Sequence, residues 1–213
     1  MSKSLGNSFL PSVLFAGSLP LLEQAYSPMT VRFFMLQSQY RSTLDFSNEA
    51  LKAAQKGYKR IANGLRIIKG MEFEADNSQA IDAEQIAEID AAIQGCYDGM
   101  NDDLNTAVTI SHLFTILKKI NQLHSGQLTF AQLGQDVFDR MKTNYINFLE
   151  QVLGLREEFP ANQEALINGM LSLYASFKEK REYDKVDEIR ASFKAMGLLV
   201  KDMKTRIDWA YEE

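Results

Sequence analysis

The sequence predicts a mainly α-helical protein: an antiparallel helical bundle followed by a small C-terminal α+β subdomain that ends in a short hairpin. Apolar residues recur at alternating steps of three and four through several long segments, which is the spacing of amphipathic helices. Short links between these segments favour antiparallel neighbours. After Gly197 the spacing gives way to two short apolar runs, which are typical of paired strands.

The first long helices have clear start signals. Ser27-Pro28 combines a hydroxyl N-cap with proline at the first helical position, so we expect a helix from residue 29 to about Tyr40. A second helix is predicted over residues 47–69, with its apolar stripe at Leu51, Ala54, Tyr58, Ile61, Leu65 and Ile68. The opposite face carries Lys52, Lys56, Lys59, Asn63 and Arg66. This face is either a solvated surface or a stripe that contacts RNA phosphates.

Three further helices complete the expected bundle. They span about residues 83–99, residues 107–123 and a long stretch that ends near residue 153. Thr129 and Gln132 form a capping-box pair before the last of them, and Gly154 is expected to end it. The link over residues 101–106 offers several N-cap oxygens to the helix that follows.

Few side chains are candidates for metal binding or catalysis. The adjacent carboxylates of Asp102 and Asp103 would suit a metal ion or acid–base chemistry, but capping of the next helix accounts for them without a ligand. His112 and His124 are twelve residues apart and do not share a helical face at ligand spacing. The single cysteine, Cys96, excludes an internal disulfide and is expected to be a small buried residue, in keeping with a reducing cytoplasm.

Charge is unevenly distributed along the chain. The net charge of −5 argues by itself against a general nucleic-acid binder. Residues 41–69 nevertheless hold seven basic and two acidic side chains, whereas residues 72–103 hold ten acidic and no basic ones. A local basic surface can therefore coexist with an acidic whole. No apolar run approaches the roughly 20 residues of a membrane span, so no membrane partner is expected.

The C-terminal part is expected to begin at residues 157–162, which contain Pro160. Two helices follow, marked by the apolar residues Leu166, Met170, Leu173 and Phe177 and then by Val186, Ile189, Phe193 and Met196. Gly197 is expected to end the second helix. Residues 198–200 and 205–209 are the predicted strands, and residues 201–204 are the predicted hairpin turn.

Four motifs are distributed over the whole chain. They are Ser2-Lys3-Ser4-Leu5-Gly6-Asn7; Tyr26-Ser27-Pro28-Met29-Thr30-Val31-Arg32-Phe33-Phe34 leading to Tyr40-Arg41-Ser42-Thr43-Leu44-Asp45-Phe46-Ser47; Met100-Asn101-Asp102-Asp103-Leu104-Asn105-Thr106; and Asp184-Lys185-Val186-Asp187-Glu188-Ile189-Arg190 before Met196-Gly197. In order and spacing they resemble cysteinyl-tRNA synthetases, from the signature loop Lys-Met-Ser-Lys-Ser to the C-terminus. The leading lysine of that loop is absent, so the chain is expected to begin inside an active-site motif.

The resemblance implies three domains and a role in ATP-dependent chemistry. Residues 1–60 would be the signature loop and stem-contact region at the end of the catalytic half, residues 61–156 the helical-bundle anticodon-binding domain, and residues 157–213 a small C-terminal anticodon-recognition domain. The family activates cysteine with ATP and transfers it to tRNA(Cys). The ATP-binding loop would comprise Met1, Ser2, Lys3 and Ser4. Lys3 would be catalytic, because its charge stabilises the triphosphate during attack on the α-phosphate.

The resemblance also implies a catalytic domain in cis that this chain lacks. In the family that domain carries the nucleotide-binding sheet and the zinc ligands that recognise cysteine, and none of those zinc ligands is expected in this chain. The chain alone is therefore expected to be unable to form cysteinyl-adenylate. It is expected to be a cytoplasmic monomer.

The expected partner is tRNA(Cys). The family's anticodon contacts match Lys178, Tyr183, Asp187 and Asp202 here, with Arg190 nearby. An aromatic ring can stack on an unpaired base, and carboxylates can accept hydrogen bonds from base edges. Lys178 stands where the family usually has an arginine, which would bind in a bidentate manner. The resemblance also favours RNA contact by the basic stripe, through Lys52, Lys56 and Lys59.

Two other interpretations remain open. A freestanding helical RNA-binding or scaffold protein would share these helices, although it would have no reason to begin inside an ATP-binding loop. A paralogous cysteine ligase that joins cysteine to an amino sugar would need no tRNA. The tail from Asn162 onward distinguishes this last alternative, because an anticodon-recognition domain would have no use there.

Overall fold

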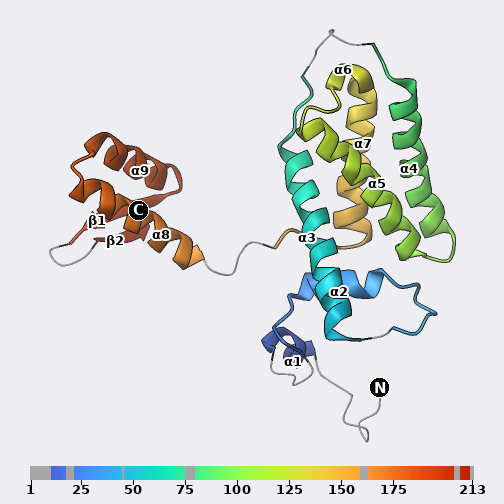
Figure 1. Cartoon of the computed structure of the whole chain (residues 1–213), viewed down its shortest axis with the longest axis horizontal. Coiled ribbons are helices and arrows are strands. Elements are labelled where there is room, and N and C mark those ends of the chain that lie inside the picture. The colour runs from blue at the N-terminus through green and yellow to red at the C-terminus, as the bar shows by residue number, and fades with distance from the viewer. Residues whose placement is uncertain are drawn as a thin grey trace, which may run out of the picture. The chain divides into compact units, whose positions relative to one another are not determined.

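The computed structural model describes residues 11–17, 22–44, 46–74, 80–158, 163–203 and 207–211. Helices predominate among these residues, and one pair of strands lies near the C-terminus (Figure 1). The predicted fold class, mainly α with a short C-terminal hairpin, is confirmed. The chain divides into two compact units, Met1–Glu158 and Phe159–Glu213. The boundary expected near residue 60 falls within a helix that continues to Gly70.

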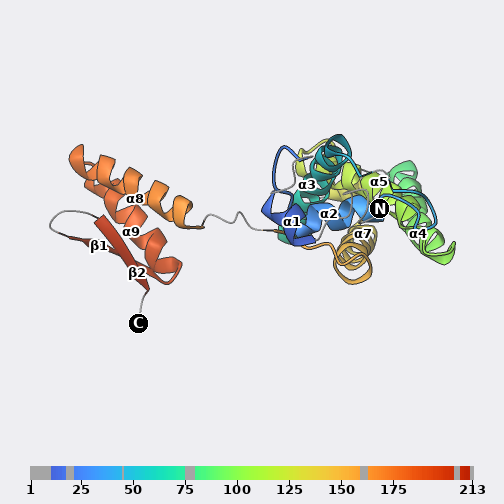
Figure 2. The ribbon, with the colours of Figure 1, turned by 90° about the horizontal axis from the view of Figure 1, so that it is seen from below.

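In the described part of the first unit, long helices form the body and shorter elements close its ends. The long helices are α3 (Asn48–Gly70), α4 (Ala83–Asn101), α5 (Thr106–His124) and α7 (Gln135–Asn147). Figure 2 looks along these helices and shows them gathered side by side. The shorter elements are α1 (Pro11–Ala16), α2 (Pro28–Leu36), α6 (Phe130–Leu133) and the π-helical turn η2 (Phe148–Val152).

The helix starts follow polar residues that the sequence singles out. The hydroxyls of Ser27 and Ser47 each accept a hydrogen bond from the backbone N–H three residues on, at 3.2 and 3.3 Å. Asn105 caps α5 in the same way, with its Oδ1 at 3.3 Å from the N–H of Val108. In the link over residues 101–106 the capping oxygen thus belongs to Asn105 and not to the two aspartates.

The predicted end of the first long helix is wrong, because α2 stops at Leu36 instead of Tyr40. The carbonyl of Leu36 accepts a hydrogen bond from the Thr106 hydroxyl at 2.7 Å, which ties this end of α2 to the start of α5. Tyr40 lies outside the helix, and its hydroxyl donates to Asp103 at 2.9 Å. These tertiary contacts outweigh the local helix preference of the segment.

The single long helix predicted to end near residue 153 is also wrong. The capping box of Thr129 and Gln132 is present, but it opens only the short α6. Gly134 follows with φ of +72°, a conformation that breaks the helix before α7 begins. Gly154 has φ of +61° and ends η2 close to the predicted place.

Close packing at Gly64 brings α3 against α5 and α7. A Cβ atom at this position would lie 2.2 Å from Cδ1 of Leu117 and 2.9 Å from the hydroxyl of Tyr145. Tyr145 is fully buried and donates to the carbonyl of Ile61 at 3.3 Å. α3 and α5 therefore lie side by side (Figure 1), and residues from both helices line the candidate site.

The second unit contains α8 (Gln163–Glu179), α9 (Tyr183–Ala195) and an antiparallel hairpin of β1 (Leu198–Asp202) and β2 (Ile207–Tyr211). Its buried residues include Leu171, Tyr174, Val186 and Phe193. The turn predicted at residues 201–204 is wrong, because Lys201 and Asp202 belong to β1. This extension of β1 pairs Asp202 with Ile207 and holds its carboxylate beside side chains from both helices.

Candidate nucleic-acid interface

The predicted basic face of α3 lies on the surface of the first unit. Lys52 is half-buried and pairs with Glu23, a partner that the sequence pattern does not indicate. Lys56 and Lys59 are exposed and have no ion pair with another described residue. These two ammonium groups are therefore available to an external anion, whereas that of Lys52 is already neutralised.

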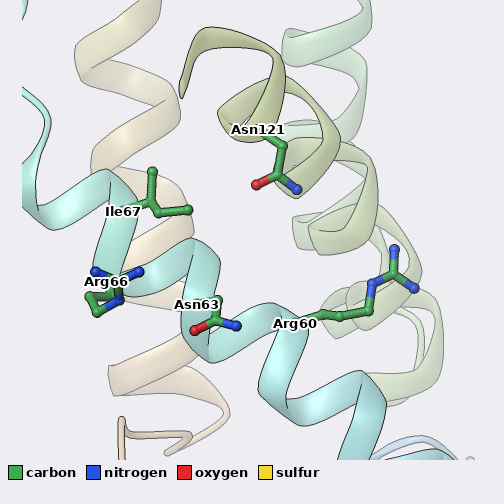
Figure 3. A pocket seen from close by; sticks show the side chains of 5 residues that line it. All are labelled: Arg60, Asn63, Arg66, Ile67 and Asn121. Carbon is green, nitrogen blue, oxygen red and sulfur yellow. The ribbon is translucent and has the colours of Figure 1, made fainter. Parts of the chain in front are cut away.

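A polar hollow of about 330 Å³ lies farther along the same face of α3. Arg60, Asn63, Arg66 and Ile67 line it from α3, and Asn121 lines it from α5 (Figure 3). Its described lining holds two guanidinium groups and no carboxylate. Sequence reasoning identified Asn63 and Arg66 but missed Arg60 and Asn121. Asn121 could not be found from helical spacing, because its position depends on how α5 packs beside α3.

A second polar cluster is built around Asp202 in the C-terminal unit. Oδ2 of Asp202 accepts hydrogen bonds from the Tyr174 hydroxyl at 3.0 Å, from Nζ of Lys178 at 2.9 Å and from the Arg190 guanidinium at 2.8 Å. Three of the predicted tRNA-binding residues, on α8, α9 and β1, are thus brought together. Oδ1 of Asp202 has no hydrogen bond from another described residue.

The two cations of the cluster stabilise the charged form of the Asp202 carboxylate. The hydrogen bond from Lys178 is the main cause that holds the pKa of Asp202 below its ordinary value, and Tyr174 and Arg190 act in the same direction. Lys178 and Arg190 also lie 5.9 and 5.5 Å from the centre of the Tyr174 ring. Tyr174 was missed by sequence reasoning, although it stands four residues before Lys178 and therefore on the same side of α8.

The other two predicted contacts of the tail lie on α9. Tyr183 is its first residue, and its side chain is 59% exposed. Asp187 is exposed, one turn farther on, with its Oδ1 at 4.0 Å from the Arg190 guanidinium. The tail thus offers an exposed ring, two cations and two carboxylates within one small unit.

The remaining candidate groups are paired or buried within the fold, or they lie outside the described residues. Asp103 pairs with Arg41 at 3.0 Å, and among the residues that the structure describes no group of three or more His, Cys, Asp or Glu could hold a metal ion. Cys96 is buried as predicted, and burial raises the pKa of its thiol to about 12. The predicted ATP-binding residues Met1, Ser2, Lys3 and Ser4 lie outside the described residues.

Comparison with known proteins tests the resemblance to cysteinyl-tRNA synthetases. Residues 96–157 match the family model of the DALR domain. All of the chain is 51% identical to a cysteine–tRNA ligase of Cytophaga hutchinsonii and covers 43% of that protein. The chain matches part of cysteine–tRNA ligase. A ligase of Porphyromonas gingivalis is 37% identical over 98% of the chain and 42% of its own length, and one of Thermococcus onnurineus is 31% identical over 98% and 43%.

The similarity to cysteine–tRNA ligases extends through both units, so the resemblance inferred from the four motifs is confirmed. The chain spans less than half the length of these relatives. The DALR match runs from the end of α4 through α5, α6, α7 and η2, and so includes Asn121 of the hollow. No helix among the described residues is long and apolar enough to cross a membrane.

Proposed function

We propose that this chain is the tRNA-holding part of a cysteine–tRNA ligase, the enzyme that activates cysteine with ATP and transfers it to tRNA(Cys). The observation that carries the proposal is the 51% identity to such a ligase along all of the chain. The match to the DALR domain and the exposed cations of both units support it.

The C-terminal unit recognises the anticodon in this proposal. Tyr183 stacks on an unpaired base, because its ring is exposed at the start of α9. Lys178 and Arg190 donate to the RNA while Asp202 holds them in place. Oδ1 of Asp202 and the carboxylate of Asp187 accept from exocyclic amino groups or a guanine edge. Asp202 thus has two roles, one for each oxygen.

The basic face of α3 contacts the RNA backbone. Lys56 and Lys59 serve this role directly, since their ammonium groups are exposed and unpaired within the described residues. Lys52 joins them only if its pair with Glu23 opens. These contacts position the RNA but carry no sequence information.

The ATP chemistry belongs to the complete ligase. In the proposal Met1, Ser2, Lys3 and Ser4 close over ATP, and Lys3 stabilises charge on the triphosphate. These four residues lie outside the described part of the chain. Zinc is assigned only to the catalytic domain of the ligase, which acts in cis. We place the protein in the cytoplasm as a monomer.

An anticodon exchange tests the proposal. The affinity of the 213-residue chain is measured by filter binding for a tRNA(Cys) transcript with its GCA anticodon and for the same transcript with another anticodon. We expect weaker binding of the altered transcript. Equal affinity for the two transcripts would contradict anticodon recognition by this chain.

A further inference from the structure

The hollow between α3 and α5 is lined by polar side chains whose hydrogen-bonding groups are not used within the described part of the chain. The side chains of Arg60, Asn63, Arg66 and Asn121 make no hydrogen bond and no ion pair with another described residue. Arg140 of α7 provides a contrast, since carboxylates on either side neutralise it, Asp136 and, at 2.9 Å, Asp90. A guanidinium with no carboxylate partner keeps its donors available to an external ligand.

The hollow is also shaped before any ligand arrives. The guanidinium of Arg60 lies over the ring of Phe114, 5.2 Å from its centre, which restrains the plane of the group and leaves its N–H donors free. Asn63 lies between the two arginines along α3, and Asn121 comes from the neighbouring helix (Figure 3). Arg60 and Arg66 lie on opposite sides of Asn63 (Figure 3), so their guanidinium groups can donate to different points of an extended ligand.

The positive charge of these donors favours an anionic ligand. The described lining includes two fixed positive charges and no carboxylate, and guanidinium groups match phosphate oxygens in a bidentate manner. The exposed Lys56 and Lys59 extend the positive face along α3. From Lys56 to Arg66 the helix rises by about 15 Å, a span that suits a chain of phosphates better than one small anion.

We infer that this hollow binds the phosphate backbone of tRNA, with Arg60 and Arg66 as charged donors to the chain of phosphates and Asn63 and Asn121 as neutral ones. The inference rests on the proposed function, and it adds Arg60 and Asn121 to the basic face on which the sequence already places Asn63 and Arg66. A phosphate contact of this kind is independent of base sequence and distinct from the anticodon contacts of the C-terminal unit.

The experiment measures the affinity of the 213-residue chain for tRNA(Cys) over a series of salt concentrations. Arg60→Gln and Arg66→Gln should each weaken binding by about tenfold and lower the slope of log affinity against log salt by about 1. Asn121→Ala should weaken binding without changing the slope, because it removes no charge. Arg140→Gln is the matched control, and both its affinity and its slope should stay those of the unmodified chain. Far-UV circular dichroism checks that each variant keeps its helices.

The outcomes separate this inference from the proposed function. If Arg60→Gln and Arg66→Gln bound tRNA(Cys) as tightly as the unmodified chain does, the phosphate site in the hollow would be refuted. The proposed function would stand. Absence of tRNA binding by the unmodified chain would overturn both. Inorganic phosphate is added in a further arm at constant ionic strength. If low millimolar phosphate abolished the difference between Arg60→Gln and the unmodified chain, the hollow would be a small-anion site and the assignment to tRNA would be overturned.

Discussion

The carboxylate of Asp103 accepts a hydrogen bond from the hydroxyl of Tyr40 at 2.9 Å, across 63 positions of the sequence. Arg41 completes the cluster, with its guanidinium 3.0 Å from Asp103 and its Nε donating to the Tyr40 hydroxyl at 3.0 Å. Asp103 and Leu104 both have φ of +54°, a left-handed conformation that costs free energy for residues with a Cβ. The contacts of Asp103 with Tyr40 and Arg41 thus attach the loop between α2 and α3 to the strained turn at Asp103 and Leu104.

We predict that Asp103→Ala frees this loop. Trypsin should cut after Arg41 several-fold faster in the variant, because the guanidinium loses its carboxylate partner. Mass spectrometry of the first cleavage products measures the rate. Asp102→Ala is the control, since the adjacent carboxylate has no partner among the described residues and its removal should leave the rate unchanged. Equal rates in both variants would contradict a restraining role for Asp103.

The C-terminal cluster predicts a specific loss of stability in acid. Lys178, together with Tyr174 and Arg190, lowers the pKa of Asp202 in the folded unit. A carboxyl group whose pKa is lowered by folding stabilises the fold above its unfolded pKa of about 4, and this contribution disappears as the pH falls through the folded pKa. Asp202→Asn should therefore flatten the stability profile of this unit below about pH 4.

The single tryptophan makes this measurement selective. Trp209 lies in β2, so its fluorescence during urea unfolding reports on the C-terminal unit. Part of the acid dependence should survive in Asp202→Asn, because Lys185 also lowers the pKa of Glu182 in the same unit. Superimposable profiles of the variant and the unmodified chain would show that Asp202 contributes nothing in acid.

Gly64→Ala should destabilise the bundle by about 1–3 kcal/mol through overpacking. The new methyl group would meet Leu117 and Tyr145, which are held by the surrounding core. Gly70→Ala is the matched control at the end of the same helix, where a Cβ meets nothing within 4 Å. Urea unfolding followed by circular dichroism compares the two variants, and an unfolding midpoint for Gly64→Ala as high as that of the control would contradict the close approach of α3 to α5.

Cys96 should be inert in the native chain. Burial raises the pKa of its thiol to about 12, so the reactive thiolate is scarce at neutral pH. We expect a thiol reagent such as Ellman's reagent at pH 8 to leave the folded chain unmodified and to label one thiol per chain in guanidinium chloride. Rapid labelling under native conditions would show that the packing of α4 against α5 opens readily.

Tyr183→Ala should weaken binding of tRNA(Cys) by about 1–3 kcal/mol, the usual contribution of one stacked base. Leu173→Ala removes a comparably exposed apolar side chain from α8, 55% exposed against 59% for Tyr183, and should have no effect. Fluorescence anisotropy with labelled tRNA measures both affinities. If both variants bound as tightly as the unmodified chain, the stacking role of Tyr183 would be refuted.

Helices and their starts could be predicted from sequence, because apolar spacing and capping residues are local signals. The stripe that begins at Leu51 and the cap at Ser47 are both found in α3. The end of α2 and the break at Gly134 could not be predicted in this way. The first depends on Thr106, 70 positions from Leu36, and the second on one glycine with positive φ.

The candidate sites likewise contain residues that the sequence predicts and residues that only the structure reveals. Lys178, Arg190 and Asp202 were predicted through the family resemblance, and the structure brings them together. Their shared contact with Tyr174 and the contribution of Asn121 to the hollow required the packing of separate elements. No local pattern encodes which side chains two neighbouring helices bring into proximity.

Hydroxyl-radical footprinting of tRNA(Cys) in the presence of the 213-residue chain tests the central claim most directly. We predict that the chain protects the anticodon loop and that this protection is lost when Tyr183→Ala and Asp202→Ala are combined. Protection of the backbone by the basic face of α3 should be retained in that double variant. An anticodon loop cleaved equally with and without the chain, under conditions where the chain binds the tRNA, would contradict the claim.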